Sequence, residues 1–132
     1  MSFTYDYLIF GSGIVCGIIL LQSSIIAPTL FSVLEVDNAG LFLRKVFPKF
    51  FLLIMFFSAL MLILVALSDD ADNTRFVLPV LNLIFSSVSY LVIPATNRSR
   101  DAGEENKFKA LHSLTVLLTV LTLVFNTLWW WF

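Results

Sequence analysis

The sequence predicts an all-α protein, a four-helix up-down transmembrane bundle, and three observations lead to this expectation. First, 59% of the 132 residues are hydrophobic and only 13% are charged, whereas soluble domains carry roughly 25% charged residues. Second, the charged residues gather in short clusters that leave four long stretches free of charge. Third, these stretches are 19 to 28 residues long, and roughly 20 apolar helical residues cross a hydrocarbon core of about 30 Å.

Each uncharged stretch predicts one helix of a single membrane domain, residues 1–132. The first helix covers about residues 7–34, and Pro28 should bend it because proline removes the hydrogen bond to the carbonyl four residues earlier. Gly13 and Gly17 lie one turn apart in this helix, and small residues at that spacing let a second helix approach closely. The remaining helices are expected over about residues 46–68, 76–97 and 108–131, with Pro48 in an interfacial turn that opens the second.

The distribution of basic residues predicts the orientation. Seven of the eight Lys and Arg residues lie in the first and third connections, and only Arg75 lies in the second. Because short connections rich in Lys and Arg stay in the cytoplasm, we expect both termini outside, which in a bacterium means the inner membrane. The second connection, residues 68–74, then lies outside, with Asn73 or Thr74 as a helix cap. Aromatic side chains suit the outer interface at Tyr5, Tyr7, Phe76, Trp129, Trp130, Trp131 and Phe132.

Polar residues form stripes on the expected helices. The last helix carries a stripe spaced by three and four residues, which places its members on one face: His112, Thr115, Thr119, Thr122 and Asn126. The third helix carries a matching set, Asn82, Ser86, Ser89 and Tyr90, and the first helix adds Gln22. Antiparallel packing of the third and fourth helices predicts that Asn82 lies at the depth of Thr122–Asn126. Two interpretations stay open: a polar path or groove, or interhelical hydrogen bonds of about 0.6 kcal/mol each.

His112 is the single histidine. A buried imidazole needs a partner, so we expect His112 to point into the bundle and to bond a hydroxyl of the third helix, a loop residue or a backbone carbonyl. A ligand role for haem or another metal is the alternative. No second ligand stands at suitable spacing, so neither a metal site nor a cofactor is predicted.

Three segments, taken in order, carry a resemblance. They are Ala27-Pro28-Thr29-Leu30-Phe31-x-x-Leu34, then Lys45-x-Phe47-Pro48-x-Phe50, then Pro94-x-x-Asn97-x-x-Arg100-Asp101 followed by Phe108-x-x-Leu111-His112-Ser113. This set resembles the transmembrane-protein-205-like family of small four-helix membrane proteins, whose bacterial members are described as a domain of unknown function. The resemblance implies a four-span bundle and draws attention to a cluster at the cytoplasmic end: Asn97, Arg100, Asp101 and His112.

The expected function is that of a non-enzymatic polytopic membrane protein, because the sequence shows no paired carboxylates, nucleophile triad or phosphate loop inside the bundle. We expect an accessory or structural component of a membrane assembly that contacts lipids, forms a homo-oligomer or joins a larger complex, and does not bind nucleic acid. One alternative is permeation or binding of a small solute or metal ion along the polar stripe. Another is a haem- or quinone-associated redox subunit.

Overall fold

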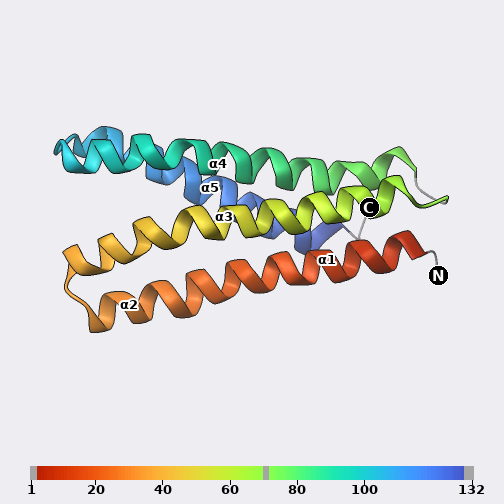
Figure 1. Ribbon diagram of the computed structural model, residues 1–132, viewed down its shortest axis with the longest axis horizontal. Helices are drawn as coiled ribbons and strands as arrows, with labels where there is room; N and C mark the ends of the chain where they lie inside the picture. The colour runs from red at the N-terminus through yellow and green to blue at the C-terminus, as the bar shows by residue number, and fades with distance from the viewer. Residues whose placement is uncertain (1–2, 70–71, 130–132) are drawn as a thin grey trace.

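The computed structural model describes residues 3–69 and 72–129, and its elements there are helical. In this part of the chain four helical runs are long and apolar enough to cross a membrane: Tyr5–Val33, Val36–Ala66, Asn73–Asp101 and Glu105–Leu128. They run alternately up and down, as Figure 1 shows. The predicted fold class, an all-α four-helix bundle, is confirmed. Asp70, Ala71 and Trp130, Trp131 and Phe132 lie outside the described residues.

The first span consists of three pieces, α1 (Phe3–Leu20), a π-helical turn η1 (Leu21–Ile26) and α2 (Ala27–Val33). Pro28 has no N–H to offer the carbonyl of Ser24, so the backbone upstream cannot keep a regular α-helical ladder. It widens instead, and the N–H of Ala27 donates to the carbonyl of Gln22, five residues back. The disturbance predicted at Pro28 therefore takes the form of a π turn.

The second span, α3 (Val36–Ala66), begins ten residues earlier than the sequence suggested. Only Leu34 and Glu35 leave the helical conformation, with ψ angles of 149° and 150°, and Asp37 in the first turn of α3 complements the positive end of the helix dipole. Pro48 lies inside α3 and does not open it. The charged segment before the second uncharged stretch, which the sequence suggested as a connection, is thus largely helical and forms the start of α3.

The connection between the second and third spans leads into a short 3-10 helix, η2 (Asn73–Phe76), and then α4 (Val77–Asp101). The cap is Asp72 and not Asn73 or Thr74, because the Asp72 carboxylate accepts hydrogen bonds from the N–H groups of Thr74 at 2.9 Å and Arg75 at 3.2 Å. The last helix, α5 (Glu105–Leu128), follows a tight turn in which Gly103 takes a positive φ of 70°.

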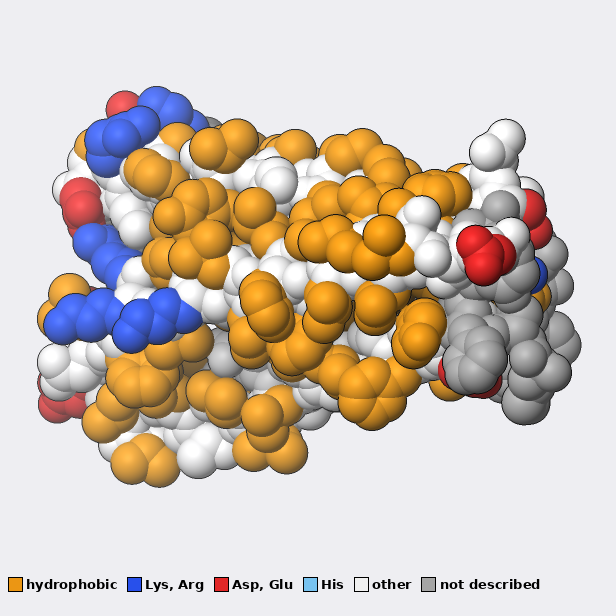
Figure 2. All heavy atoms as spheres, turned by 45° about the vertical axis from the view of Figure 1, so that its right-hand side comes forward, with side chains coloured by type: hydrophobic (Ala, Val, Ile, Leu, Met, Phe, Trp, Pro, Cys, Tyr) orange, Lys and Arg blue, Asp and Glu red, His pale blue; other side chains and the backbone are white. Residues whose placement is uncertain are grey.

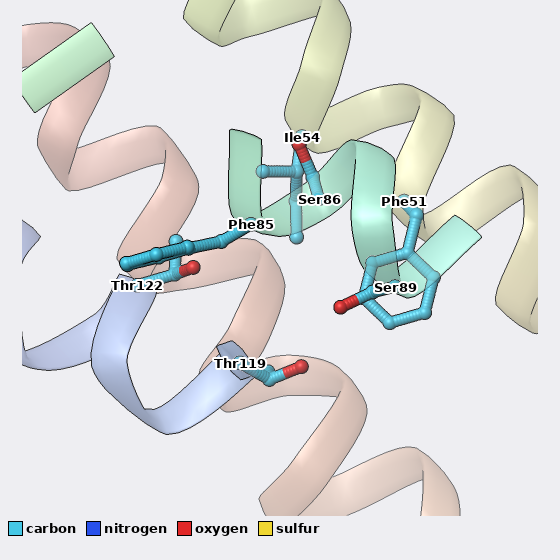
Figure 3. Close-up of a pocket in the computed structure, with 7 residues that line it drawn as sticks. All are labelled: Phe51, Ile54, Phe85, Ser86, Ser89, Thr119 and Thr122. Atoms are coloured by element: carbon cyan, nitrogen blue, oxygen red, sulfur yellow. The ribbon is translucent and has the colours of Figure 1, made fainter. Parts of the chain in front are cut away.

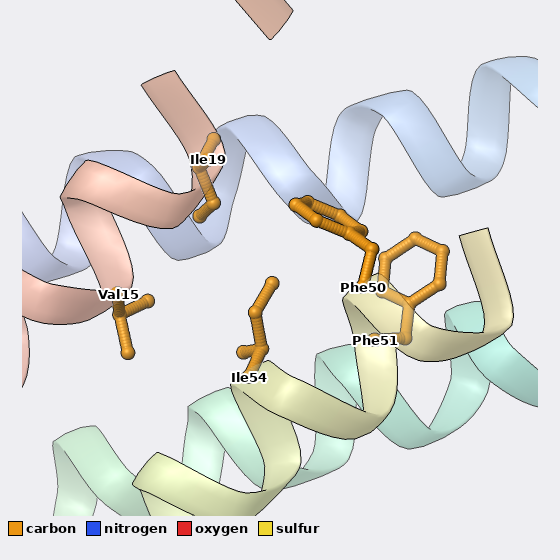
Figure 4. Packing of buried hydrophobic residues seen from close by; sticks show 5 residues of the cluster. All are labelled: Val15, Ile19, Phe50, Phe51 and Ile54. Carbon is orange, nitrogen blue, oxygen red and sulfur yellow. The ribbon is translucent and has the colours of Figure 1, made fainter. Parts of the chain in front are cut away.

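Around the bundle, α3 and α4 are neighbours, α4 and α5 are neighbours, and α1 packs against both α3 and α5. A cluster of buried apolar side chains fills the space between α1 and α3, as Figure 4 shows: Val15, Ile19, Phe50, Phe51 and Ile54. A second cluster lies nearer the chain termini: Leu8, Met61, Val65 and Leu78.

The outer surface is largely apolar between two polar ends. Large apolar side chains such as Phe10 and Leu91 are 72% and 73% exposed, which fits contact with lipid and not with water. Figure 2 shows Lys and Arg side chains gathered at one end of this apolar surface. We call this the basic end; it is formed by the α2–α3 and α4–α5 connections with their flanking turns and carries Arg44, Lys45, Lys49, Arg98, Arg100, Lys107 and Lys109.

Candidate functional site

An asparagine pair joins α4 and α5 inside the bundle. The Asn82 side chain is fully buried and that of Asn126 is 4% exposed. Nδ2 of Asn126 donates to Oδ1 of Asn82 at 2.8 Å, and Nδ2 of Asn82 donates back to Oδ1 of Asn126 at 3.2 Å. Nδ2 of Asn126 also donates to the carbonyl oxygen of Thr122 at 2.7 Å. The predicted equality of depth for Asn82 and the Thr122–Asn126 segment is confirmed.

One to two turns further toward the basic end, hydroxyl side chains of α4 and α5 face a small pocket, seen in Figure 3. Its lining contains four hydroxyls and three apolar side chains: Ser86, Ser89, Thr119, Thr122, Phe51, Ile54 and Phe85. The hollow between them is too narrow to hold the centre of a water molecule. The polar stripes of the two helices therefore meet, as the sequence predicted, but they meet in a closed interior.

The hydrogen-bond state of these hydroxyls decides what the pocket can bind. Ser86 donates to the Asn82 carbonyl at 2.5 Å, and Thr119 and Thr122 donate to carbonyls four residues back at 2.8 Å. These three oxygens keep acceptor lone pairs. Ser89 is 1% exposed, and its hydroxyl has no partner among the described residues. The lining thus presents acceptors and one free donor, but a molecule with hydrogen-bond donors of its own could reach them only if the helices moved apart, because the hollow has no room for water.

Gln22 and Tyr90, also predicted for the polar site, take different positions. Gln22 belongs to the π turn and is 5% exposed, and its Nε2 has no partner among the described residues. Tyr90 is half-buried and packs against the first apolar cluster. Ser12, which sequence reasoning missed, is 3% exposed with an unpartnered hydroxyl. A buried polar group without a partner lowers the stability of the fold by about 1–3 kcal/mol. Gln22 and Ser12 are therefore further sites where the interior is destabilised by an unsatisfied polar atom.

The prediction that His112 points into the bundle and forms a hydrogen bond is wrong. Its side chain is exposed, and no hydrogen bond to it occurs within the described parts of the chain. Its ring stacks on Phe108 instead, with 5.7 Å between the ring centroids and an interplanar angle of 6°. Thr115, next on the predicted stripe, is half-buried and donates to the His112 backbone carbonyl at 2.8 Å. The stripe therefore enters the bundle only from Thr119 onward.

The cluster expected at the basic end is only partly assembled. Arg100 lies over the ring of Phe108, 5.1 Å from its centroid, so Arg100 and His112 share this ring. Asp101 turns instead to Arg44 of α3, which donates two hydrogen bonds of 3.1 and 2.5 Å to its carboxylate oxygens. Asn97 lies half-buried one turn before these residues.

The expectation that Gly13 and Gly17 face another helix is not met within this chain. Both are exposed, and a Cβ built on either would meet no atom within 4 Å. The helix approach depends on Gly11, where a Cβ would overlap the Met61 side chain, with Sδ at 2.6 Å. Within one chain the close approach is thus at Gly11, which the sequence analysis did not single out, and a contact of Gly13 and Gly17 with a second copy stays a prediction.

Charge and spacing could also have found the Arg44–Asp101 pair, because both residues belong to charged segments of the sequence that an up-down bundle brings to the same end. Phe108 gave no such signal, because an aromatic residue at a helix start looks like any interfacial anchor.

Within residues 3–69 and 72–129, no three His, Cys, Asp or Glu side chains lie together as metal ligands.

A family described as a domain of unknown function, DUF4149, matches residues 10–105, which covers most of the first span, the second and third spans and the turn into the fourth. No curated protein and no solved structure is similar enough to count as a match.

Proposed function

We propose, from the premise that this chain belongs to the DUF4149 family of unknown function, that it is a non-enzymatic component of a membrane assembly. In this proposal the chain self-associates, and the outward face of α1 is the surface through which one copy meets another. The observation that carries the proposal is the open space over Gly13 and Gly17.

The α1 face has the composition of a helix–helix interface. Gly13 and Gly17 are exposed on it, flanked by Phe10, which is 72% exposed, and by Leu20 and Leu21, each 50% exposed. Lipid tails provide no hydrophobic drive between helices, so close backbone approach at small residues is the main route to association. A groove at two glycines between bulky side chains permits that approach.

If Gly13 and Gly17 contacted only lipid, nothing would offset the free energy that glycine costs inside a helix. Glycine in a helix interior is about 1 kcal/mol less favourable than alanine. Gly11 recovers that cost by letting Met61 pack against α1, whereas Gly13 and Gly17 recover nothing within this chain. A second copy packed on the same face would supply the missing contact.

The test compares Gly13→Leu and Gly17→Leu with Ala110→Leu, which adds a similar volume at an exposed position of α5. Apparent mass in mild detergent, measured by light scattering and native mass spectrometry, is the readout. We expect the wild type and Ala110→Leu to associate and the two glycine variants to become monomeric with unchanged melting. A wild type that stays monomeric at every concentration, or glycine variants that associate normally, would contradict the proposal.

A second candidate function, binding or passage of a small neutral hydrogen-bond donor, is favoured by the buried, unpartnered hydroxyl of Ser89 in the hydroxyl pocket. Solute permeability of proteoliposomes is the measurement, with Ser89→Ala and Thr119→Val as variants and Ser113→Ala, an exposed serine of α5, as the control. Permeability no higher than that of empty liposomes would reject this candidate.

Three more detailed predictions from the sequence belong to the same proposal. They are the resemblance to the transmembrane-protein-205-like family, a location in the inner membrane of a bacterium, and both termini outside the cytoplasm. The seven basic residues at one end of the bundle support the orientation. The exposure of His112 takes away the main support for the haem- or quinone-associated alternative, because an axial ligand within one chain would sit inside the bundle.

A further inference from the structure

The turn between α4 and α5 has a fixed shape. The N–H groups of Ala102 and Glu104 donate to the carbonyls of Arg98 and Ser99 at 2.9 Å, and that of Gly103 donates to the Arg100 carbonyl at 3.2 Å. These bonds close the end of α4 in the manner of a helix C-cap with a left-handed glycine. Side chains on both sides of the turn are therefore held in a constant relation.

Most carboxylates near this turn are already paired. Asp101 binds Arg44, Glu104 lies 2.9 Å from Lys107, and Glu105 lies 3.6 Å from Lys109. Arg98 and Arg100 have no carboxylate within 4.0 Å in the part of the chain that the structure describes. The remaining acidic residues of this end belong to the other hairpin, where Glu35 precedes α3 and Asp37 lies in its first turn. These two guanidinium groups thus form no direct ion pair within the described residues, although the charge of Arg100 acts on the adjacent Asp101 carboxylate.

Arg100 differs from Arg98 in being held in place. Its guanidinium carbon lies 5.1 Å from the centroid of the Phe108 ring, a cation–π contact. Such a contact uses the face of the guanidinium and leaves its in-plane N–H donors free. The same ring stacks in parallel with the exposed imidazole of His112. Phe108 therefore organises two nitrogen-bearing groups that make no hydrogen bond within the described residues.

We propose that Arg100, positioned by the Phe108 ring, binds a phosphate group at the basic end of the bundle. A planar guanidinium with free in-plane donors matches two phosphate oxygens, and prior ordering on an aromatic face reduces the entropy lost on binding. His112 lies near the start of the uncharged stretch 110–132, so the group sits at the depth of lipid headgroups. A headgroup phosphate or a free phosphate offers the same chemistry.

The experiment uses the whole protein in a non-ionic detergent with three probes: dioctanoyl phosphatidic acid, dioctanoyl phosphatidylcholine and inorganic phosphate. Native mass spectrometry and ³¹P spectroscopy measure binding of the lipids and of phosphate. The variants are Arg100→Gln and Phe108→Leu, and Arg98→Gln is the matched control because it removes the same charge two residues away. Circular dichroism checks that each variant keeps its helices.

We expect Arg100→Gln to weaken binding of phosphatidic acid about tenfold, the size of one charge-assisted hydrogen-bond pair. Phe108→Leu should weaken it by a smaller factor, and Arg98→Gln should leave it within about twofold, since residues two apart on a helix do not face each other. If only phosphatidic acid binds in an Arg100-dependent way, the ligand is a lipid headgroup. If inorganic phosphate binds in an Arg100-dependent way, with or without phosphatidic acid, the site recognises the phosphate group itself. Equal losses in Arg98→Gln and Arg100→Gln, equal binding of phosphatidylcholine and phosphatidic acid, or no binding of any probe would overturn the proposal.

Discussion

Asn82 and Asn126 exchange two amide hydrogen bonds across the interface between α4 and α5, at a depth where neither side chain reaches solvent. Each amide is both donor and acceptor for the other, so neither can be replaced by an apolar residue without leaving its partner unsatisfied. In hydrocarbon an unsatisfied polar group has no water to turn to. The pair therefore fixes the register of α5 against α4.

The asparagine pair should show coupling in a double-mutant cycle. Asn82→Leu and Asn126→Leu should each lower the free energy of unfolding by about 0.6–2 kcal/mol. Asn126→Leu leaves the Asn82 amide unpaired, and Asn82→Leu leaves Oδ1 of Asn126 without a donor while its Nδ2 keeps the Thr122 carbonyl. The double variant should lose less than the sum of the two, since it leaves no amide behind. Unfolding of the reconstituted protein in mixed micelles of rising dodecyl sulfate content measures all three values. Additive losses would show that the two amides act independently.

Gly11 should tolerate substitution far less well than its two neighbours on α1. A Cβ at Gly11 would overlap Met61, whereas Gly13 and Gly17 have open space. Gly11→Ala should destabilise the protein by about 1–3 kcal/mol through overpacking, while Gly13→Ala and Gly17→Ala should leave the melting temperature of the monomer unchanged or raised. Shortening the partner in Gly11→Ala/Met61→Ala should make the loss smaller than the two single losses combined. Melting in detergent distinguishes these outcomes, and equal effects at all three glycines would contradict the packing seen here.

Helix periodicity was sufficient for one half of α5 and failed for the other. Spacing by three and four residues places His112 and Asn126 on a common face only if the helix follows a seven-residue repeat, and a straight α-helix drifts by about 20° per heptad. Over the two heptads from Asn126 to His112 that drift amounts to about 40°, which moves His112 toward the edge of the buried face, and the imidazole stacks on Phe108 instead. Thr119, Thr122 and Asn126 stay inside because the drift across them is small.

The other differences between the expected and observed helices have separate causes, and the first is that charged residues were taken to mark a loop. Arg44 and Lys45 lie inside α3, because a helix can continue into the headgroup region and carry its charges there. A disturbance of the helix at Pro28 could be predicted, but its conformation could not, since a bend and a π turn both accommodate a missing N–H. Which glycine faces a neighbour depended on the rotation of α1 about its axis, and this rotation follows from the packing of Val15 and Ile19.

The cap at Asp72 should make the start of α4 sensitive to acid. The hydroxyl of Thr74 donates to Oδ1 of Asp72 at 2.5 Å, and this bond, helped by the backbone N–H groups of Thr74 and Arg75, lowers the pKa of Asp72 from its ordinary value of 3.8. A carboxylate whose pKa is lower in the folded state stabilises the fold above its unfolded pKa and loses that effect as the pH falls through the folded value.

Acidification from about pH 5 to about pH 2 should therefore speed amide hydrogen–deuterium exchange at Thr74 and Arg75, after correction for the intrinsic pH dependence of exchange. Asp72→Asn should abolish this pH dependence while keeping a cap, and Asp69→Asn, which removes a neighbouring carboxylate outside the cap, should preserve it. An Asp72→Asn variant with the same acid response as the wild type would exclude the cap as its source.

The basic end should face the cytoplasm, with both termini outside. Seven of the eight basic residues lie at this end, and the Arg44–Asp101 pair, which joins the two hairpins there, neutralises only one of them. Positive charge in short connections retains them on the cytoplasmic side during insertion. Alkaline phosphatase fused after Phe132 should be active and a fluorescent protein fused there dark, whereas a fluorescent protein inserted at Gly103 should be bright. The reverse pattern would refute this orientation without affecting the fold, and Arg98→Glu combined with Arg100→Glu should shift the signals toward that pattern.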